Sequence, residues 1–242
     1  MNAIEIRSLT KKYGEVTAVD NLSLTVKEGE LFALLGVNGA GKTTTVKLLT
    51  CLTAPTAGDA LLMGKSILHD TAEVKRLVGI SPQETAVAGG LTVLENLTMM
   101  CGIYGFSKEK QQKKIADCAA QLGLDRVLSR KAGKLSGGWQ RRLSIAMALI
   151  GEPQILFLDE PTLGLDVLAR SELWDTITAL KGKTTVILTT HYMEEAEALS
   201  DRIAIMKDGK LLVCDTPDAL KAQTGTTSIE QAFIRTVKGV NQ

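Results

Sequence analysis

Three short, mostly apolar runs predict strands that are buried on both faces: Leu31–Leu35, Ile155–Leu158 and Thr185–Thr190. A helical pattern follows each of these runs, around residues 44–50, 173–180 and 193–199. Buried strands that alternate with helices are typical of an α/β fold with a parallel sheet. The hydrophobic pattern therefore predicts such a sheet as the core of this protein.

The first part of the chain, residues 3–30, has a different pattern. Ile4 and Ile6 alternate with polar neighbours, and so do Leu22, Leu24 and Val26. Alternation of this kind predicts short antiparallel strands with one buried face. Further strands are predicted at residues 60–63, 78–80, 203–206 and 211–213, the last two joined by a hairpin turn.

From about residue 84 the pattern becomes helical. Thr92 and Glu95 form the sequence signature of a capping box, and apolar residues at helical spacing follow it. A second helix, which begins near Lys108, and the apolar run 143–150 complete this region. We interpret residues 84–150 as a helical lobe inserted between strands of the core, and residues 216–242 as a helical tail that starts with Thr216 and Pro217.

The composition argues against several classes of protein, among them nucleic-acid-binding and membrane-spanning proteins. The chain has 242 residues, of which 45% are hydrophobic and 23% charged, and its net charge is +1. This balance lacks the basic excess of nucleic-acid-binding proteins, and no run of about twenty apolar residues predicts a membrane span. The start of the chain does not resemble a signal peptide. The four cysteines have no metal or redox spacing, so we expect small core residues of a reduced, cytoplasmic protein.

The segment after the first buried strand fits the pattern G-x-x-x-x-G-K-[ST] at every fixed position. Its glycines allow several backbone N–H groups to point at one centre, and the helix N-terminus adds partial positive charge. Lys42 can reach phosphate oxygens, and the Thr43 hydroxyl can ligate Mg²⁺. An ordinary glycine-rich turn is the alternative, but it does not require the strand before and the helix after. The sequence thus predicts a phosphate-binding loop made of Gly36, Val37, Asn38, Gly39, Ala40, Gly41, Lys42 and Thr43.

Polar residues follow three other predicted strands at their C-terminal ends. Asp159 and Glu160 come directly after residues 155–158, His191 after residues 185–190, and Gln83 after residues 78–80. Ligands of open α/β sheets bind at this edge. Two acids in a surface turn are the alternative reading of Asp159 and Glu160, which the apolar run before them disfavours.

Two further features can be interpreted either as structural or as functional. Ser136, Gly137 and Gly138 stand at a predicted helix start, where they can act as a simple N-cap or can present N–H groups to an anion. Tyr13, upstream of the phosphate loop, can be a packing residue or can stack on a nucleotide base.

Taken in order, these motifs resemble those of the ATP-binding cassette (ABC) ATPases, and the resemblance covers residues 3 to about 235. The Ser-Gly-Gly signature is the specific part, because other phosphate-loop proteins lack it. The Asn-Lys-x-Asp guanine motif of small GTPases is absent from the sequence. The resemblance implies one domain, 1–242, with a P-loop NTPase core, an N-terminal antiparallel β subdomain and the inserted helical lobe.

The resemblance also implies a role for each matching residue. Tyr13 would stack on adenine, and residues 36–43 with Thr44 would bind the nucleotide. Thr43, Gln83 and Asp159 would act on Mg²⁺. The residues implied in catalysis are Glu160, which polarises the attacking water, His191, which contacts the γ-phosphate, and Gln83, which senses it.

A shared active site is the next implication. Ser136, Gly137 and Gly138 would bind the γ-phosphate of ATP held by the opposite subunit of a head-to-tail dimer, and Asp166 would lie at the dimer interface. The second subunit could be identical or different. Trp139 departs from the family pattern, since this signature position is usually a polar residue. We expect Trp139 to change interface packing rather than phosphate binding.

The function implied is that of an ATP-hydrolysing subunit, which powers transport through separate polytopic membrane subunits and lies on the cytoplasmic face of the cell membrane. The segment Thr227–Ile234 resembles one that closes many exporter subunits of the drug-resistance type, which favours export. The alternatives are a soluble ABC ATPase that acts in complex assembly, and a nucleotide-binding regulator, against which Glu160 and His191 argue. No residue encodes the transported substrate, and no nucleic-acid partner is expected.

Overall fold

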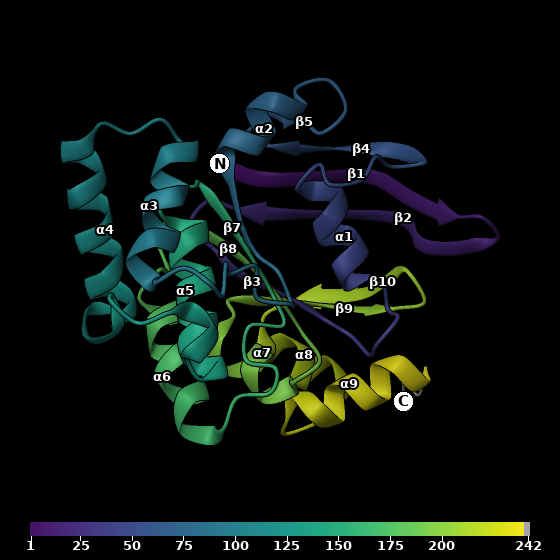
Figure 1. Cartoon of the computed structure of the whole chain (residues 1–242). Coiled ribbons are helices and arrows are strands. Elements are labelled where there is room, and N and C mark those ends of the chain that lie inside the picture. The colour runs from purple at the N-terminus through teal and green to yellow at the C-terminus, as the bar shows by residue number, and fades with distance from the viewer. Residues whose placement is uncertain (240–242) are drawn as a thin grey trace.

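Six strands form the central sheet of the computed structural model, which describes residues 1–239 (Figure 1). Their order is β10-β9-β3-β8-β7-β6. The strands are β3 (Leu31–Leu35), β6 (Val78–Ser81), β7 (Ile155–Asp159), β8 (Thr185–Thr190), β9 (Arg202–Lys207) and β10 (Lys210–Asp215). All neighbours pair in parallel except the hairpin β9–β10, which is antiparallel. The predicted parallel core and the predicted hairpin are confirmed.

A second, antiparallel sheet has the order β2-β1-β4-β5. It contains β1 (Asn2–Tyr13), β2 (Val16–Lys27), β4 (Ala57–Leu62) and β5 (Lys65–Ser66). The prediction of several short strands before residue 30 is wrong in length, because β1 and β2 each have 12 residues. Four register shifts interrupt their pairing. Each bulge breaks the alternation of buried and exposed side chains, so the sequence pattern suggests shorter strands.

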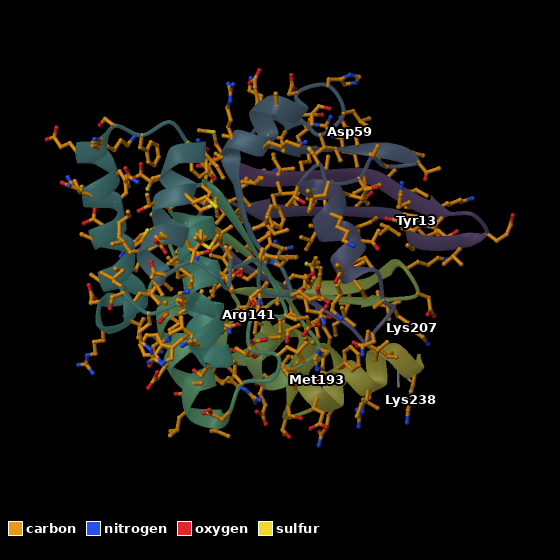
Figure 2. All side chains as sticks on the ribbon, viewed as in Figure 1. Tyr13, Asp59, Arg141, Met193, Lys207 and Lys238 are labelled. Atoms are coloured by element: carbon orange, nitrogen blue, oxygen red, sulfur yellow. The ribbon has the colours of Figure 1, made fainter. Side chains whose placement is uncertain are left out.

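The two sheets share one hydrophobic core. Ile4 and Leu22 of the antiparallel sheet lie in the same buried cluster as Phe32 and Phe157 of the parallel sheet. Two short helices flank the antiparallel sheet and its connections, α1 (Lys42–Leu49) and α2 (Thr71–Leu77). The shared core fixes the position of Tyr13, at the end of β1, relative to the central sheet (Figure 2).

Helices occupy the chain between β6 and β7 and lie together on the left of Figure 1. They are α3 (Val93–Ile103), α4 (Lys108–Leu122), the 3₁₀ turns η1 (Asp125–Val127) and η2 (Ala132–Lys134), and α5 (Gly137–Leu149). The predicted capping box is confirmed: Glu95 N–H donates to Thr92 Oγ1 at 3.1 Å, and Thr92 N–H donates to Glu95 Oε2 at 2.7 Å. A single buried cluster joins these helices to β7 and β8.

The remaining helices are α6 (Val167–Thr178), α7 (Met193–Leu199), α8 (Pro217–Thr224) and α9 (Ile229–Lys238). Pro217 occupies the first turn of α8, as predicted. Phe233 of α9 packs in one buried cluster with Leu35 and Ile205 of the central sheet. Residues 240–242 of the predicted tail lie outside the described residues. Within residues 1–239, no helix combines the length and the apolar character needed to cross a membrane.

The cysteines only partly follow the prediction. Cys101 and Cys118 are buried in the helical region, where burial raises the pKa of the Cys118 thiol to about 11. Cys51 and Cys214 are only half-buried. The prediction that all four cysteines are core residues is therefore wrong for these two. Cys214 lies on the edge strand β10, where neighbouring structure covers the chain less completely.

Candidate nucleotide-binding site

The C-terminal ends of β3, β6, β7 and β8 open on the same edge of the sheet, because these strands run parallel. A cavity of about 720 Å³ lies at this edge. The predicted residues that line it are Tyr13, Asn38, Gly39, Ala40, Gly41, Lys42, Thr43, Thr44, Gln83, Glu160 and His191. Its volume lies within the range of small-molecule sites. Gly36, Val37 and Asp159, also predicted, do not line the cavity.

Sequence reasoning missed five residues that line this cavity: Val16, Thr17, Ala18, Leu163 and Asp208. Tyr13 is 48% exposed, which argues against a mainly internal packing role for this side chain. Asp208 comes from the β9–β10 turn. These residues carry no motif, since β1, β2 and this turn reach the phosphate loop only in the folded chain.

The glycines of the loop are required by its geometry at two positions. A Cβ atom on Gly36 would lie 2.6 Å from the carbonyl oxygen of Met206, and one on Gly41 would lie 2.4 Å from that of Ala18. Gly41 also has a φ of 101°, in the region that favours glycine. The loop therefore packs directly against the backbone of β2 and β9.

We expect Gly41→Ala to destabilise the protein more than Gly39→Ala does. Gly39 also has a positive φ, 82°, but open space surrounds the position of its Cβ. Gly39→Ala should thus lower the free energy of unfolding by only the backbone cost, about 1–2 kcal/mol. Gly41→Ala adds a clash with a main-chain carbonyl, for a total of about 3 kcal/mol or more. Denaturant unfolding measures both variants, and equal losses would contradict the clash.

Lys42 has a defined position within the loop. Its ammonium group is buried, donates to the carbonyl oxygens of Gly36 at 2.7 Å and Val37 at 3.3 Å, and lies 3.5 Å from Glu160 Oε1. The loop carbonyls and a carboxylate thus stabilise the charge of a lysine that lines the cavity. Anionic oxygens bound in the cavity would be able to interact with this cation.

Glu160 joins the two sides of the cavity. Its Oε2 lies 2.7 Å from His191 Nδ1, and its Oε1 faces Lys42. The residue has a φ of 50°, in the left-handed region that is uncommon for residues other than glycine. Two acceptors of Thr189, its carbonyl and hydroxyl oxygens, each bind the Glu160 N–H at 3.1 Å. Thr189, which sequence reasoning missed, therefore helps to hold this strained backbone.

Thr43, which lines the cavity, contacts Asp159, which does not line it. Thr43 Oγ1 donates to Asp159 Oδ1 at 3.2 Å, and Thr189 Oγ1 donates to the same oxygen. Adjacent ligands of an octahedral Mg²⁺ at 2.0–2.1 Å are about 2.9 Å apart. The Thr43 and Asp159 oxygens thus have a separation that suits two ligands of one magnesium ion, with the other positions left to phosphate and water.

Arg141 of α5 is a further residue that sequence reasoning missed (Figure 2). It is buried, and its guanidinium donates to the carbonyl oxygens of Pro82 and Gln83, each at 2.6 Å. Burial lowers the pKa of Arg141, while nearby Asp159 and Glu195 oppose this shift. The two hydrogen bonds fix the backbone from which the Gln83 side chain reaches the cavity.

Ser136, Gly137, Gly138 and Asp166 lie elsewhere. Ser136 is at the N-cap position of α5, as predicted, but its side chain makes no capping hydrogen bond. Asp166 caps α6 by accepting the Ala169 N–H at 2.9 Å. Among residues 1–239, none of these four lines the cavity of its own chain.

Trp139 packs against the helical core rather than against the cavity. The guanidinium of Arg142 lies 5.5 Å from the centre of its ring, and Arg142 also pairs with Glu172 of α6 at 2.6 Å. Trp139, which stands where the signature usually has a polar residue, therefore contributes to the packing of α5 against its neighbours.

Fold and cavity together define a P-loop nucleotide-binding protein with an ABC-type signature helix. Residues 19–163 match the ABC transporter family model. Over 240 residues the chain is 42% identical to the probable multidrug ABC transporter ATP-binding protein YbhF of Escherichia coli (strain K12), covering 97% of this chain and 41% of YbhF. Over 232 residues it is 40% identical to the doxorubicin resistance ATP-binding protein DrrA of Mycobacterium tuberculosis (strain CDC 1551 / Oshkosh), covering 94% of this chain and 70% of DrrA.

A solved structure supports the same assignment. The dimeric ATP-binding cassette MJ0796, in a post-hydrolysis state bound to ADP and Pi, superposes with a TM-score of 0.78 and 29% identity, covering 88% of this chain and 98% of that chain. This chain therefore belongs to the ABC transporter family, as one of its ATP-binding cassettes. The predicted family and fold class are confirmed. The chain spans less than half the length of YbhF.

Proposed function

We propose that this chain hydrolyses ATP to power export through separate polytopic membrane subunits. The observation that carries the proposal is the position of Glu160, which faces Lys42 on one side and His191 on the other at a cavity lined by the phosphate loop. This arrangement places a carboxylate, a cation and an imidazole around one reaction centre, which phosphoryl transfer needs for positioning and charge stabilisation.

Each side chain then has a role in the reaction. Glu160 orients or deprotonates the attacking water, while Lys42 and His191 oppose negative charge on the γ-phosphate. Tyr13, which lines the cavity, stacks on adenine. Thr43 and Asp159, with Gln83, would hold Mg²⁺. When bound, this ion neutralises charge on the β- and γ-phosphates.

The proposed active unit is a head-to-tail dimer with two ATP molecules at its interface. The signature residues Ser136, Gly137 and Gly138 do not line the cavity of their own chain. This supports a role for their N–H groups toward the γ-phosphate of ATP on a second cassette. Exposed apolar side chains next to Asp166 support an interface there, since Val167 and Leu168 are each 77% exposed.

The oligomeric state of Glu160→Gln tests this proposal. We expect a monomer without nucleotide and a dimer with Mg-ATP, because the variant binds ATP but scarcely hydrolyses it. Static light scattering measures the mass in both conditions, with Mg-ADP as the control. A monomer that persists despite demonstrated ATP binding would contradict a self-sufficient homodimer, and mixing with a candidate partner cassette would then test a heterodimer.

The membrane partner needs its own experiment. Purification of the tagged chain from detergent-solubilised membranes should yield a polytopic protein, which would also place this subunit on the cytoplasmic face of the membrane. A soluble complex without a membrane protein would favour the alternative, an ATPase that acts in complex assembly. We further propose a single ABC domain in which residues 84–150 form the lobe and residues from about 216 onward form the tail.

A further inference from the structure

Glu195 is a buried carboxyl group that the proposed mechanism does not use. It lies on α7, four residues after His191, and its relative exposure is 0%. In the sequence it is one of several acids in this helix, but the neighbouring Glu194 is exposed. Burial of a carboxyl group is unfavourable unless hydrogen bonds compensate for the lost hydration. Its surroundings should therefore explain why the group is there.

The contacts of Glu195 come from three other segments. Trp174 of α6 donates its indole N–H to Glu195 Oε1 at 3.2 Å. The hydroxyls of Thr190 and Thr162 lie near enough to lower the pKa of the carboxyl, although burial raises it more strongly and Glu160 adds to the increase. Among residues 1–239, Glu195 Oε2 and Thr162 Oγ1 are both buried without a hydrogen-bond partner.

Thr190 and Thr162 adjoin segments of the reaction centre, and Trp174 belongs to α6. Thr190 is the last residue of β8 and directly precedes His191. Thr162 follows Glu160 by two residues, in the loop that leads to Asp166. Trp174 belongs to α6, the helix that Asp166 caps. Glu195 thus lies where the segments that carry Glu160 and His191 meet α6.

Glu195 and Thr162 can satisfy each other's hydrogen-bonding needs. A threonine hydroxyl is both a donor and an acceptor, and a carboxyl oxygen is an acceptor. The Thr162 hydroxyl can therefore donate to Glu195 Oε2, while Oε1 keeps the indole N–H of Trp174. This arrangement satisfies both buried oxygens, which otherwise cost free energy as unpaired polar groups.

We propose that Glu195 is a positioning residue for ATP hydrolysis, a buried hydrogen-bonding group that holds the Glu160 segment and the His191 segment in their mutual geometry. The inference rests on the roles proposed above for Glu160 and His191. Glu195 itself does not line the cavity and contacts no reacting atom. Its effect is carried by Thr162 and Thr190, each close in sequence to a residue of the reaction centre.

The test compares Glu195→Gln with Glu195→Leu in the full chain. Glutamine is similar in shape, and its amide can donate to Thr162 Oγ1 while its oxygen accepts from Trp174, so kcat for ATP hydrolysis should remain within about twofold of the wild-type value. Leucine fills the space without hydrogen bonds, so kcat should fall at least about 10-fold, because small misplacement of catalytic groups is costly. The Kd for ATP should not change in either variant, since the phosphate loop is untouched.

Thr162→Val tests the same role of Glu195 if Glu195→Leu does not fold. Thr162→Val removes a buried hydroxyl that has no partner, so a purely structural role predicts equal or higher thermal stability and an unchanged kcat. Our proposal instead predicts a kcat lowered by about 3-fold to 10-fold at unchanged ATP affinity. A wild-type kcat in Thr162→Val, or an equal loss in Glu195→Gln and Glu195→Leu, would overturn it.

Two controls separate this inference from the proposed function. Glu194→Gln alters the exposed neighbour on the same helix and should leave kcat unchanged. Glu160→Gln, measured in the same assay, tests the reaction centre itself. If Glu160→Gln is inactive while Glu195→Leu has the wild-type kcat, only the inference about Glu195 fails. If Glu160→Gln is fully active, the proposed roles fail first.

Discussion

Replacing Glu160 with glutamine is expected to lower kcat for ATP hydrolysis by about 10²–10⁴-fold, the usual contribution of a general base. The amide keeps the size of the side chain, but it is not a base and cannot take a proton from water, and it replaces the carboxylate that contacts His191 Nδ1 at 2.7 Å. ATP affinity should be retained, because the phosphate loop and Lys42 remain in place. Phosphate release and equilibrium nucleotide binding measure the two effects separately.

A matched control for this variant is Glu172→Gln. Glu172 also pairs with a basic residue, Arg142, but it does so at the surface of α6 and away from the cavity. Exposed ion pairs contribute about 0–1 kcal/mol, so this change should leave kcat within a factor of two. If Glu160→Gln turned over ATP as fast as the control, Glu160 could not be the base.

Lys42→Ala is expected to weaken ATP binding by about 100-fold. Its ammonium group is the cation that lies among the loop carbonyls, and hydrogen bonds to charged groups contribute about 1.5–3 kcal/mol each. Two such bonds to phosphate correspond to about two to four powers of ten in Kd, and 100-fold is the lower end of this range. Titration with a fluorescent ATP analogue or with ATP by calorimetry measures the change.

Lys47→Ala provides the control for Lys42→Ala. Lys47 lies in the last turn of the same helix, α1, and does not line the cavity. Its replacement should leave Kd within a factor of two. The lysine variant also leaves Glu160 without its neighbour at 3.5 Å, so thermal unfolding should be measured beside binding. Unchanged ATP affinity in folded Lys42→Ala would refute the role of the loop lysine.

The phosphate loop, the capping box and the parallel core were predictable because each depends on residues that are close in sequence. Gly41 needs its left-handed backbone wherever the loop is placed, and Thr92 reaches Glu95 within one helical turn. The edge at which Glu160 and His191 meet was also predictable, since parallel strands bring their C-terminal ends together. Their proposed roles still depend on the resemblance to ABC ATPases.

Other features could not be predicted because their partners lie far apart in sequence. Arg141 binds the backbone of Pro82 and Gln83, 59 and 58 residues away. Because every residue has a backbone carbonyl, the sequence does not show which carbonyls accept these hydrogen bonds, and no motif marks this contact. The long strands β1 and β2 were misjudged for a related reason, since only pairing shows where a bulge shifts the register.

By itself, the sequence of this protein determined the class of fold, the phosphate loop and the order of the polar residues at the strand ends, because local periodicity and short motifs encode these features. Only the tertiary structure decided that Lys42 and His191 converge on Glu160, that the signature residues do not line the cavity of their own chain, and that Glu195 is buried beside the segments of the reaction centre. The reason is that burial and interatomic distances arise from the packing of segments that are remote in sequence, and local sequence patterns do not encode this packing.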